Sequence, residues 1–207
     1  MIPAVMPTYA RYDLAFDHGE GAYLWDSANR RYLDFGAGIA VASLGHCHPH
    51  LVEAIREQAG KLMHTSNLYN IPGQQRLAER LVANTFADAV FFNNSGNEAV
   101  ELGVKMIRRY QYANGHPERY RVITVQGAFH GRSLAMLSAG KQEKHLKGFG
   151  PEVDGFDQVA FDNLNEMKAA IGPETAGILV EPVQGEGGIR PMSKAYLQSL
   201  RAIADEF

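Results

Sequence analysis

Short apolar segments alternate with amphipathic segments from residue 89 to the end of the chain. The expected strands, apolar and in part β-branched, are residues 89–92, 121–125, 159–161 and 176–180. Helical periodicity marks the residues between and after them, at 95–110, 130–140, 163–171 and 193–207. Strands that alternate with helices build βαβ units, so this pattern predicts an α/β fold with a mainly parallel sheet flanked by helices.

The first part of the chain has a different pattern. Residues 1–20 are expected to be irregular, and the apolar runs at 22–26 and 32–35 predict a hairpin. A Gly- and His-rich loop follows at 36–49, and then two helices near 51–62 and 73–86. We place the boundary at 65–75, which gives an N-terminal segment of 1–70 and an α/β part of 71–207.

Charge and cysteine content limit the classes of partner and location. A net charge of −3, from 20 Lys and Arg against 23 Asp and Glu, gives no support for a nucleic-acid or membrane-surface partner. The single cysteine, Cys47, excludes an intrachain disulfide and fits a cytoplasmic, reducing location. The sequence has no secretory signal and no apolar run of the ~20 residues that span a bilayer.

The first candidate site lies where the apolar segment 89–92 runs into a helix. Ser95 and Glu98 form a capping box, so the helix is expected to begin there. The first N–H groups of the helix are then free, and Gly96 lets a ligand approach the backbone closely. This arrangement suits a phosphate, although a capped helix end without a ligand fits equally well.

The loop after residues 121–125 carries three side chains suited to a ligand. Phe129 can stack on a flat ring, His130 follows it, and Arg132 can hold a carboxylate through two parallel hydrogen bonds. In open α/β sheets, ligands bind at the carboxyl ends of strands. The alternative is a core phenylalanine beside a surface arginine.

The loop after residues 176–180 carries two carboxylates. Glu181 and Glu186 are expected to meet cations, to face a polar cleft or to be solvated in a turn. Elsewhere, the histidines of the 45–50 segment suggest a metal site, but Pro49 favours a structural turn into a helix. Three further lysines are expected to form a solvated, mobile face: Lys141, Lys144 and Lys147.

Seven motifs, in this order along nearly the whole chain, resemble those of the class III aminotransferases, and most closely the acetylornithine branch of that family. The motifs are Leu24-Trp25-Asp26, Tyr32-Leu33-Asp34-Phe35, Gly38-Ile39-Ala40-Val41, Leu44-Gly45-His46-Cys47-His48-Pro49, Ser95-Gly96-Asn97-Glu98-Ala99, Phe129-His130-Gly131-Arg132 and Glu181-Pro182-Val183-Gln184-Gly185-Glu186-Gly187. The resemblance implies the type I fold of pyridoxal-phosphate (PLP) enzymes and a homodimer. It also implies that residues 1–70 belong to the small domain and 71–207 to an incomplete large domain.

The resemblance implies a role for each candidate residue. Residues expected to bind PLP are Ser95, Gly96, Asn97, Phe129 and His130, with the backbone at 96 and 97 on the phosphate and Phe129 on the ring. Residues expected to line the substrate pocket are Arg132, on the α-carboxylate, Glu181 and Glu186. The family usually has Ala or Thr where this chain has Asn97, and a backbone contact tolerates the change.

Two residues that the family requires have no match in this chain. They are the lysine that forms the Schiff base with PLP and the aspartate that pairs with the pyridine nitrogen, and we expect both beyond Phe207. No Gly, Asn or Pro terminates the last helical pattern, which also favours a longer chain.

The function that the resemblance implies is transamination between N-acetylornithine and 2-oxoglutarate, in arginine biosynthesis. Succinylornithine, ornithine and 4-aminobutyrate are alternative substrates. Two further hypotheses are a short, non-catalytic remnant of the fold and a metalloenzyme that uses His46, His48 and His50.

Overall fold

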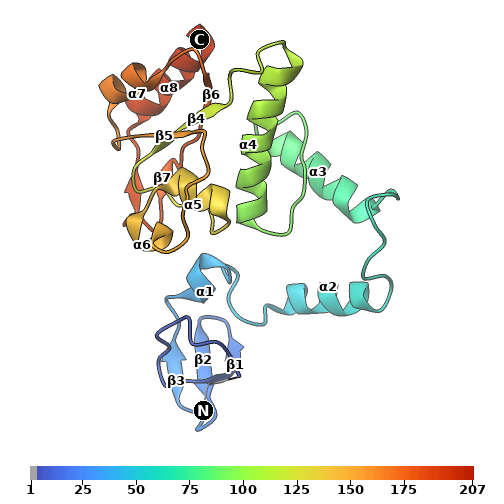
Figure 1. Ribbon diagram of the computed structural model, residues 1–207. Helices are drawn as coiled ribbons and strands as arrows, with labels where there is room; N and C mark the ends of the chain where they lie inside the picture. The colour runs from blue at the N-terminus through green and yellow to red at the C-terminus, as the bar shows by residue number, and fades with distance from the viewer. Residues whose placement is uncertain (1–3) are drawn as a thin grey trace. The chain divides into compact units, whose positions relative to one another are not determined.

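The computed structural model describes residues 4–207, which form two compact units, 4–88 and 89–207 (Figure 1). This division by contacts falls after Asp88, later than the boundary expected at 65–75. The assignment of residues 1–70 and 71–207 to a small and a large domain stays a prediction. None of the helices in the described part is long and apolar enough to cross a membrane.

The first unit contains a three-stranded antiparallel sheet and three helical segments. Its strands, in the order β1-β2-β3, are β1 (Phe16–Glu20), β2 (Tyr23–Asp26) and β3 (Arg31–Leu33). Its helical segments are α1 (Ala37–Ala40), α2 (Pro49–Ala59) and α3 (Pro72–Asn84). The expected hairpin and both expected helices are confirmed.

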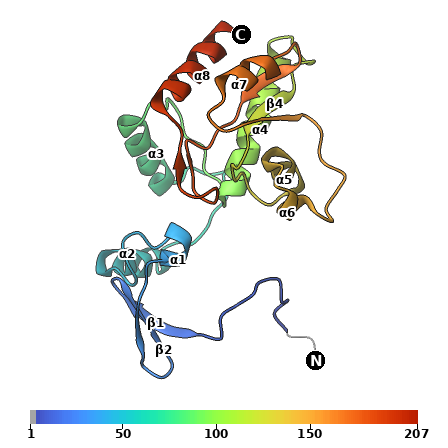
Figure 2. The same ribbon diagram turned by 90° about the vertical axis from the view of Figure 1, so that its left-hand side faces the viewer.

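The prediction that residues 1–20 are irregular is wrong for β1. Its polar sequence has no clear alternation, yet the strand pairs with β2, and the ring of His18 stacks on Trp25 at 5.0 Å. The two strands lie side by side in Figure 2. A contact from the neighbouring strand therefore stabilises β1 where the local sequence gives no signal.

The second unit is built on a three-stranded parallel sheet with the order β5-β4-β6. Its elements are α4 (Gly96–Ala113), β4 (Arg121–Val125), α5 (Leu134–Gly140), α6 (Glu143–Leu146), β5 (Phe156–Val159), α7 (Leu164–Ala170), β6 (Thr175–Ile178), β7 (Val183–Gln184), β8 (Arg190–Pro191) and α8 (Lys194–Glu206). The α/β class with a parallel sheet flanked by helices is confirmed.

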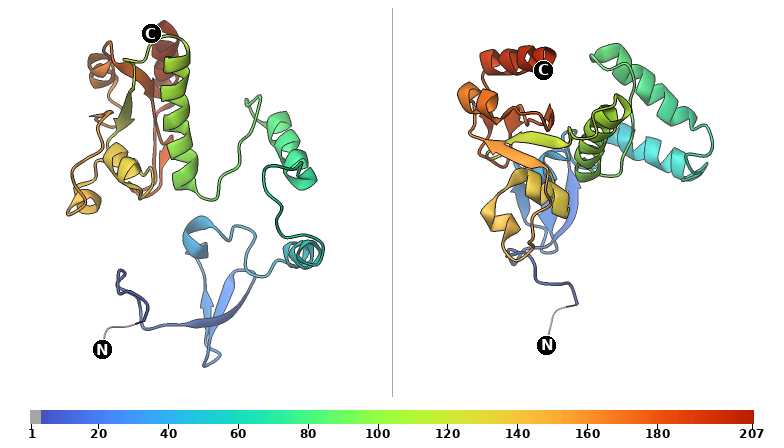
Figure 3. Two further views of the ribbon diagram at one scale, coloured as in Figure 1. Left: turned by 45° about the vertical axis from the view of Figure 1, so that its right-hand side comes forward. Right: turned by 45° about the horizontal axis from the view of Figure 1, so that its top comes forward.

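β4 is the centre of this unit and is covered on both faces. Ile123 and Val125 pack with α7 and α8, whereas Val122 packs with α4 and α5. The right-hand view of Figure 3 shows α7 and α8 on one side of the strands and α5 on the other. Since side chains alternate along a strand, one apolar run fills two cores.

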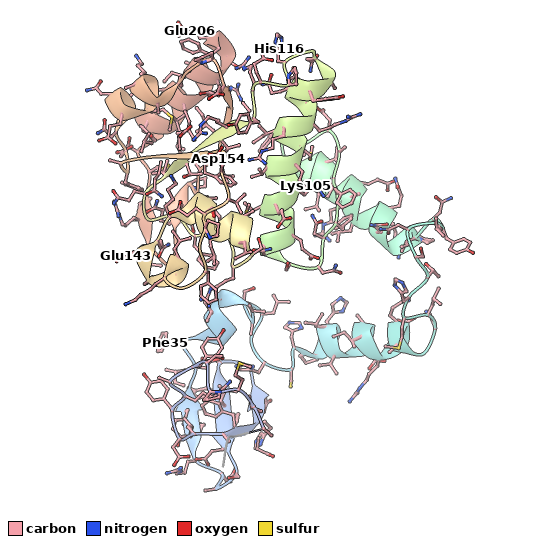
Figure 4. The ribbon with its side chains drawn as sticks, viewed as in Figure 1. Phe35, Lys105, His116, Glu143, Asp154 and Glu206 are labelled. Atoms are coloured by element: carbon pink, nitrogen blue, oxygen red, sulfur yellow. The ribbon has the colours of Figure 1, made fainter. Side chains whose placement is uncertain are left out.

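Arg121, at the start of β4, fastens that strand to β5. Its guanidinium donates to both carboxylate oxygens of Asp157, at 2.9 and 2.7 Å, and to Asp154 at 3.0 Å. Asp154 is labelled in Figure 4. The hydrogen bonds from Arg121 lower the pKa of Asp157 below its usual value, so the carboxylate stays ionised.

Two strand predictions in this unit need correction. Residues 89–92 do not form a strand, because no strand within 4–207 pairs with them, and Phe91 is 66% exposed. The strand expected at 159–161 lies instead at Phe156–Val159. Its position is set by pairing with β4, in which Val122 lies opposite Phe156.

Candidate functional site

The candidate site lies where the loops after β4 and β6 begin at the same edge of the sheet. The two strands are parallel neighbours, so their carboxyl ends point the same way. The loop of residues 126–133 follows β4, and the segment of residues 179–189, which includes the short strand β7, follows β6. The N-terminus of α4 contacts the first loop through a side chain.

The N-terminus of α4 is capped as the sequence predicts. The Ser95 hydroxyl accepts the Glu98 N–H at 3.2 Å and donates to the Glu98 carboxylate at 3.1 Å. That carboxylate also accepts the Asn94 N–H at 2.9 Å. Hydrogen bonds from the side chains of Asn94 and Ser95 lower the pKa of Glu98, so the helix end is fixed by an ionised carboxylate.

The first two N–H groups of α4 are open to a ligand. Within residues 4–207, neither Gly96 nor Asn97 donates its N–H to a protein acceptor. A Cβ atom built on Gly96 would meet nothing within 4 Å, so the space beside this backbone position is open. Two unused donors at a positive helix end fit a phosphate group.

The side chain of Asn97 has a role that the sequence did not predict. Its Oδ1 accepts the N–H of Arg132 at 2.8 Å and the N–H of Ser133 at 3.0 Å. These bonds join α4 to the loop after β4. The one sequence feature that indicates the close approach of loop and helix is the glycine at position 131. Asn97 therefore joins the first and second candidate sites.

The loop after β4 exposes one ring and buries another. Phe129 is 37% exposed, lies at 6.3 Å edge-on to the ring of His145 and has the Arg132 guanidinium 5.8 Å from its centroid. The alternative of a core phenylalanine is therefore wrong. His130 is 4% exposed, and burial lowers the pKa of its imidazole.

Glu181 binds backbone groups rather than standing free. Its carboxylate accepts the N–H of Phe129 at 2.9 Å and the N–H of Gly185 at 3.1 Å. One side chain thus ties the loop after β4 to the loop after β6. The alternative of a solvated turn does not apply to this residue.

Glu186 is paired with a cation, Lys144, which confirms one of the expectations. Lys144 Nζ lies 2.8 Å from its carboxylate and His145 Nε2 lies 3.6 Å away, and the Lys144 bond lowers the pKa of Glu186. Lys144 is exposed, as the prediction of a solvated face requires, and it also forms this ion pair. The short helix α6, missed from sequence, carries Lys144 and His145 to Glu186.

The histidine cluster of the first unit has a structural contact. His46 Nε2 lies 2.7 Å from an Asp34 carboxylate oxygen whose partner oxygen accepts the N–H groups of Gly36 and Ala37. Among the described residues, no group of three or more His, Cys, Asp or Glu side chains is arranged to hold a metal ion. This arrangement gives the metalloenzyme hypothesis no support.

Comparison with known proteins assigns the class. Residues 5–207 match the family model for the class III aminotransferases, and the chain belongs to that family. The acetylornithine aminotransferase of Mesorhizobium japonicum is 62% identical over 98% of this chain and 51% of its own length. The chain spans about half the length of the curated relatives it matches.

Solved structures confirm the fold of the PLP-dependent aminotransferases. An N-acetylornithine aminotransferase from Stenotrophomonas maltophilia superposes with a TM-score of 0.79 at 36% identity, over 96% of this chain and 49% of that one. An ornithine aminotransferase from Toxoplasma gondii, with partial occupancy of PLP at its active site, superposes with a TM-score of 0.89 at 30% identity. It covers 98% of this chain and 48% of its own.

Proposed function

We propose that this protein is a PLP-dependent aminotransferase that transfers the ω-amino group of N-acetylornithine to 2-oxoglutarate in arginine biosynthesis, and that it acts in the cytoplasm as a homodimer. The observation that carries the proposal is the convergence, at one edge of the sheet, of an open helix N-terminus, an exposed aromatic ring and a guanidinium with no carboxylate partner within residues 4–207. The names of the relatives support the choice of substrate.

The cofactor phosphate is assigned to the N-terminus of α4. The N–H groups of Gly96 and Asn97 have no protein acceptor within residues 4–207 and can bind it, with the Ser95 hydroxyl beside them. The exposed ring of Phe129 can stack on the pyridine ring. When bound, PLP supplies an electron sink for the carbon that carries the amino group.

Arg132 is assigned to the substrate carboxylate. Its guanidinium makes no hydrogen bond or ion pair with a carboxylate in the described part of the chain. Its positive charge nevertheless contributes to lowering the pKa of Glu186. Since Lys144 already occupies Glu186, the arginine stays available for a ligand. A planar guanidinium can then hold a carboxylate through two parallel hydrogen bonds.

Glu181 is assigned to holding the loop that carries the ring and the arginine, and His130, expected to contact PLP, lies buried in the same loop. Burial keeps the His130 pKa below its usual value, so the imidazole is neutral at pH 7 and adds no second cation beside Arg132. Glu181 fixes the backbone at Phe129 and so orients the phenyl ring that is proposed to stack on the cofactor ring.

We also propose that the lysine that binds PLP covalently and the aspartate at its pyridine nitrogen lie beyond Phe207. Within residues 4–207, Lys144 is the one lysine bonded to a candidate-site residue. Its ammonium forms an ion pair with Glu186, which supports a PLP-binding lysine elsewhere. The share of the relatives' length that the chain spans, about half, is also consistent with it.

The test is a comparison of amino donors on the purified protein at its natural length. We expect glutamate to form from 2-oxoglutarate with a higher kcat/KM for N-acetylornithine than for N-succinylornithine, ornithine or 4-aminobutyrate. A higher kcat/KM for another donor would change the assigned substrate and leave the assigned reaction, transamination, in place. Protein that neither binds PLP nor forms glutamate with any of the four would refute the proposal.

A further inference from the structure

Asn97 uses its two polar parts in opposite directions. Its backbone N–H is one of the open donors at the end of α4, whereas its side-chain Oδ1 accepts the N–H of Arg132 at 2.8 Å and of Ser133 at 3.0 Å. One acceptor atom therefore fixes two successive residues of the loop after β4. Arg132 is the residue whose guanidinium we assign to the substrate.

The backbone at Gly131 is shaped around the Asn97 amide. Its φ of +132° is rare for L side chains, and a Cβ atom at this position would collide with Oδ1 and lie 2.7 Å from Cγ of Asn97. The loop thus passes the amide with no room for a side chain. Such a close fit restricts where the backbone of Arg132 can lie.

A second side chain of α4 bonds to the same stretch of loop. The Ser133 hydroxyl donates to the Glu101 carboxylate at 3.0 Å, and Glu101 follows Asn97 by one helical turn. Ser133 is also the residue before α5, which begins at Leu134. The face of α4 that carries Asn97 and Glu101 therefore holds the loop at its exit, next to Arg132.

We propose that Asn97 is a positioning residue: its Oδ1 couples the phosphate-binding end of α4 to the carboxylate-binding Arg132. The inference rests on the proposed function and names the residue that sets the arginine relative to the cofactor. Asn97 acts through the backbone of Arg132 and does not itself bind the substrate. A change in its side chain should then alter substrate binding while leaving the backbone N–H for the phosphate.

Two substitutions separate these roles in the protein at its natural length. Asn97→Ala removes the acceptor and keeps the N–H. We expect hydrogen exchange at the amides of Arg132 and Ser133 to rise about tenfold. We expect KM for N-acetylornithine to rise about tenfold or more, with PLP affinity within about twofold of wild type.

Asn97→Asp keeps an acceptor at Oδ1 but puts a negative charge beside the phosphate. We expect exchange at both amides to stay as in wild type, while PLP affinity falls at least about tenfold. Asn114→Ala, at the far end of the same helix, is the matched control, and we expect it to change none of the three quantities.

The outcomes distinguish this inference from the proposed function. Unchanged exchange at Arg132 and Ser133 in Asn97→Ala would overturn the coupling, as would faster exchange with an unchanged KM. If Asn97→Ala does not fold, equal losses of PLP and substrate binding in Asn97→Asp would overturn it instead. Failure of the proposed function appears in wild type, as absence of PLP binding and glutamate formation, and the inference then falls too.

Discussion

Glu181 and Phe129 are joined by a hydrogen bond of 2.9 Å from the Phe129 N–H to the Glu181 carboxylate, although the two residues lie on loops after different strands. The same carboxylate accepts the Gly185 N–H at 3.1 Å. Glu181→Ala removes both acceptors, and we expect a loss of about 1–2 kcal/mol in the free energy of unfolding. Glu181→Gln keeps one acceptor oxygen and should lose less. Urea unfolding monitored by circular dichroism measures both, and equal stability of all three proteins would contradict the role of the bond.

Substitution of Arg132 should separate substrate binding from cofactor binding. Arg132→Ala removes the fork of donors, so we expect KM for N-acetylornithine to rise about a hundredfold, whereas PLP affinity stays within about twofold. Arg132→Lys keeps the charge without the planar fork and should recover only part of the loss. Steady-state kinetics and PLP titration by absorbance give the two quantities. Parallel losses of both would count against the assignment of Arg132.

Lys144 should protect Arg132 from Glu186. Without the ammonium of Lys144, Glu186 can attract the guanidinium of Arg132, which then competes with the substrate carboxylate. We expect Lys144→Met to raise KM about two- to fivefold at low salt, with little change in stability because the pair is partly exposed. Lys147→Met, on an exposed neighbour, is the control. A KM equal in all three proteins across a salt titration would refute this role.

The Arg121–Asp157 pair should make stability depend on pH in the acid range. The pKa of Asp157 is lower in the folded protein than in the unfolded chain, so the folded state binds fewer protons at this site. Its contribution is therefore complete above the unfolded value of about 3.9 and is lost as pH falls through the folded pKa. We expect Asp157→Asn to flatten the fall in the urea midpoint below about pH 4. The control is Asp88→Asn, on an exposed carboxylate, and an acid limb equally steep in Asp157→Asn and wild type would contradict the prediction.

Local signals in the sequence predicted the framework of the second unit. The β-branched run at Arg121–Val125 and the capping box at Ser95 and Glu98 depend on residues close together in the chain, and both appear as expected. The carboxylates of Glu181 and Glu186 were singled out because charges that directly follow a buried strand need partners. The partners seen in the structure were not predicted, because Phe129 and Lys144 are distant in sequence; the resemblance implied an arginine from later in the chain for Glu186.

The errors have the same origin. β1 forms through pairing with β2, and residues 89–92 stay unpaired despite an apolar sequence that favours a strand. In both cases the presence or absence of a neighbouring strand determines whether the segment forms a strand. Periodicity within one segment contains no information about that neighbour. The contact of Asn97 with Arg132 was missed for the same reason, since the amide is a good helix-start residue whatever lies opposite it.

The central place of β4 also sets the order in which the molecule can fold. Val122 pairs with Phe156 on one side and with Gly177 on the other, so both neighbours of β4 arrive from far along the chain. Closing such long loops is slow, and β6 leaves the ribosome after β4 and β5. Until β6 docks, Phe129 has no Glu181 to hold it. A nascent chain therefore acquires this part of its ligand site only after β6 has docked.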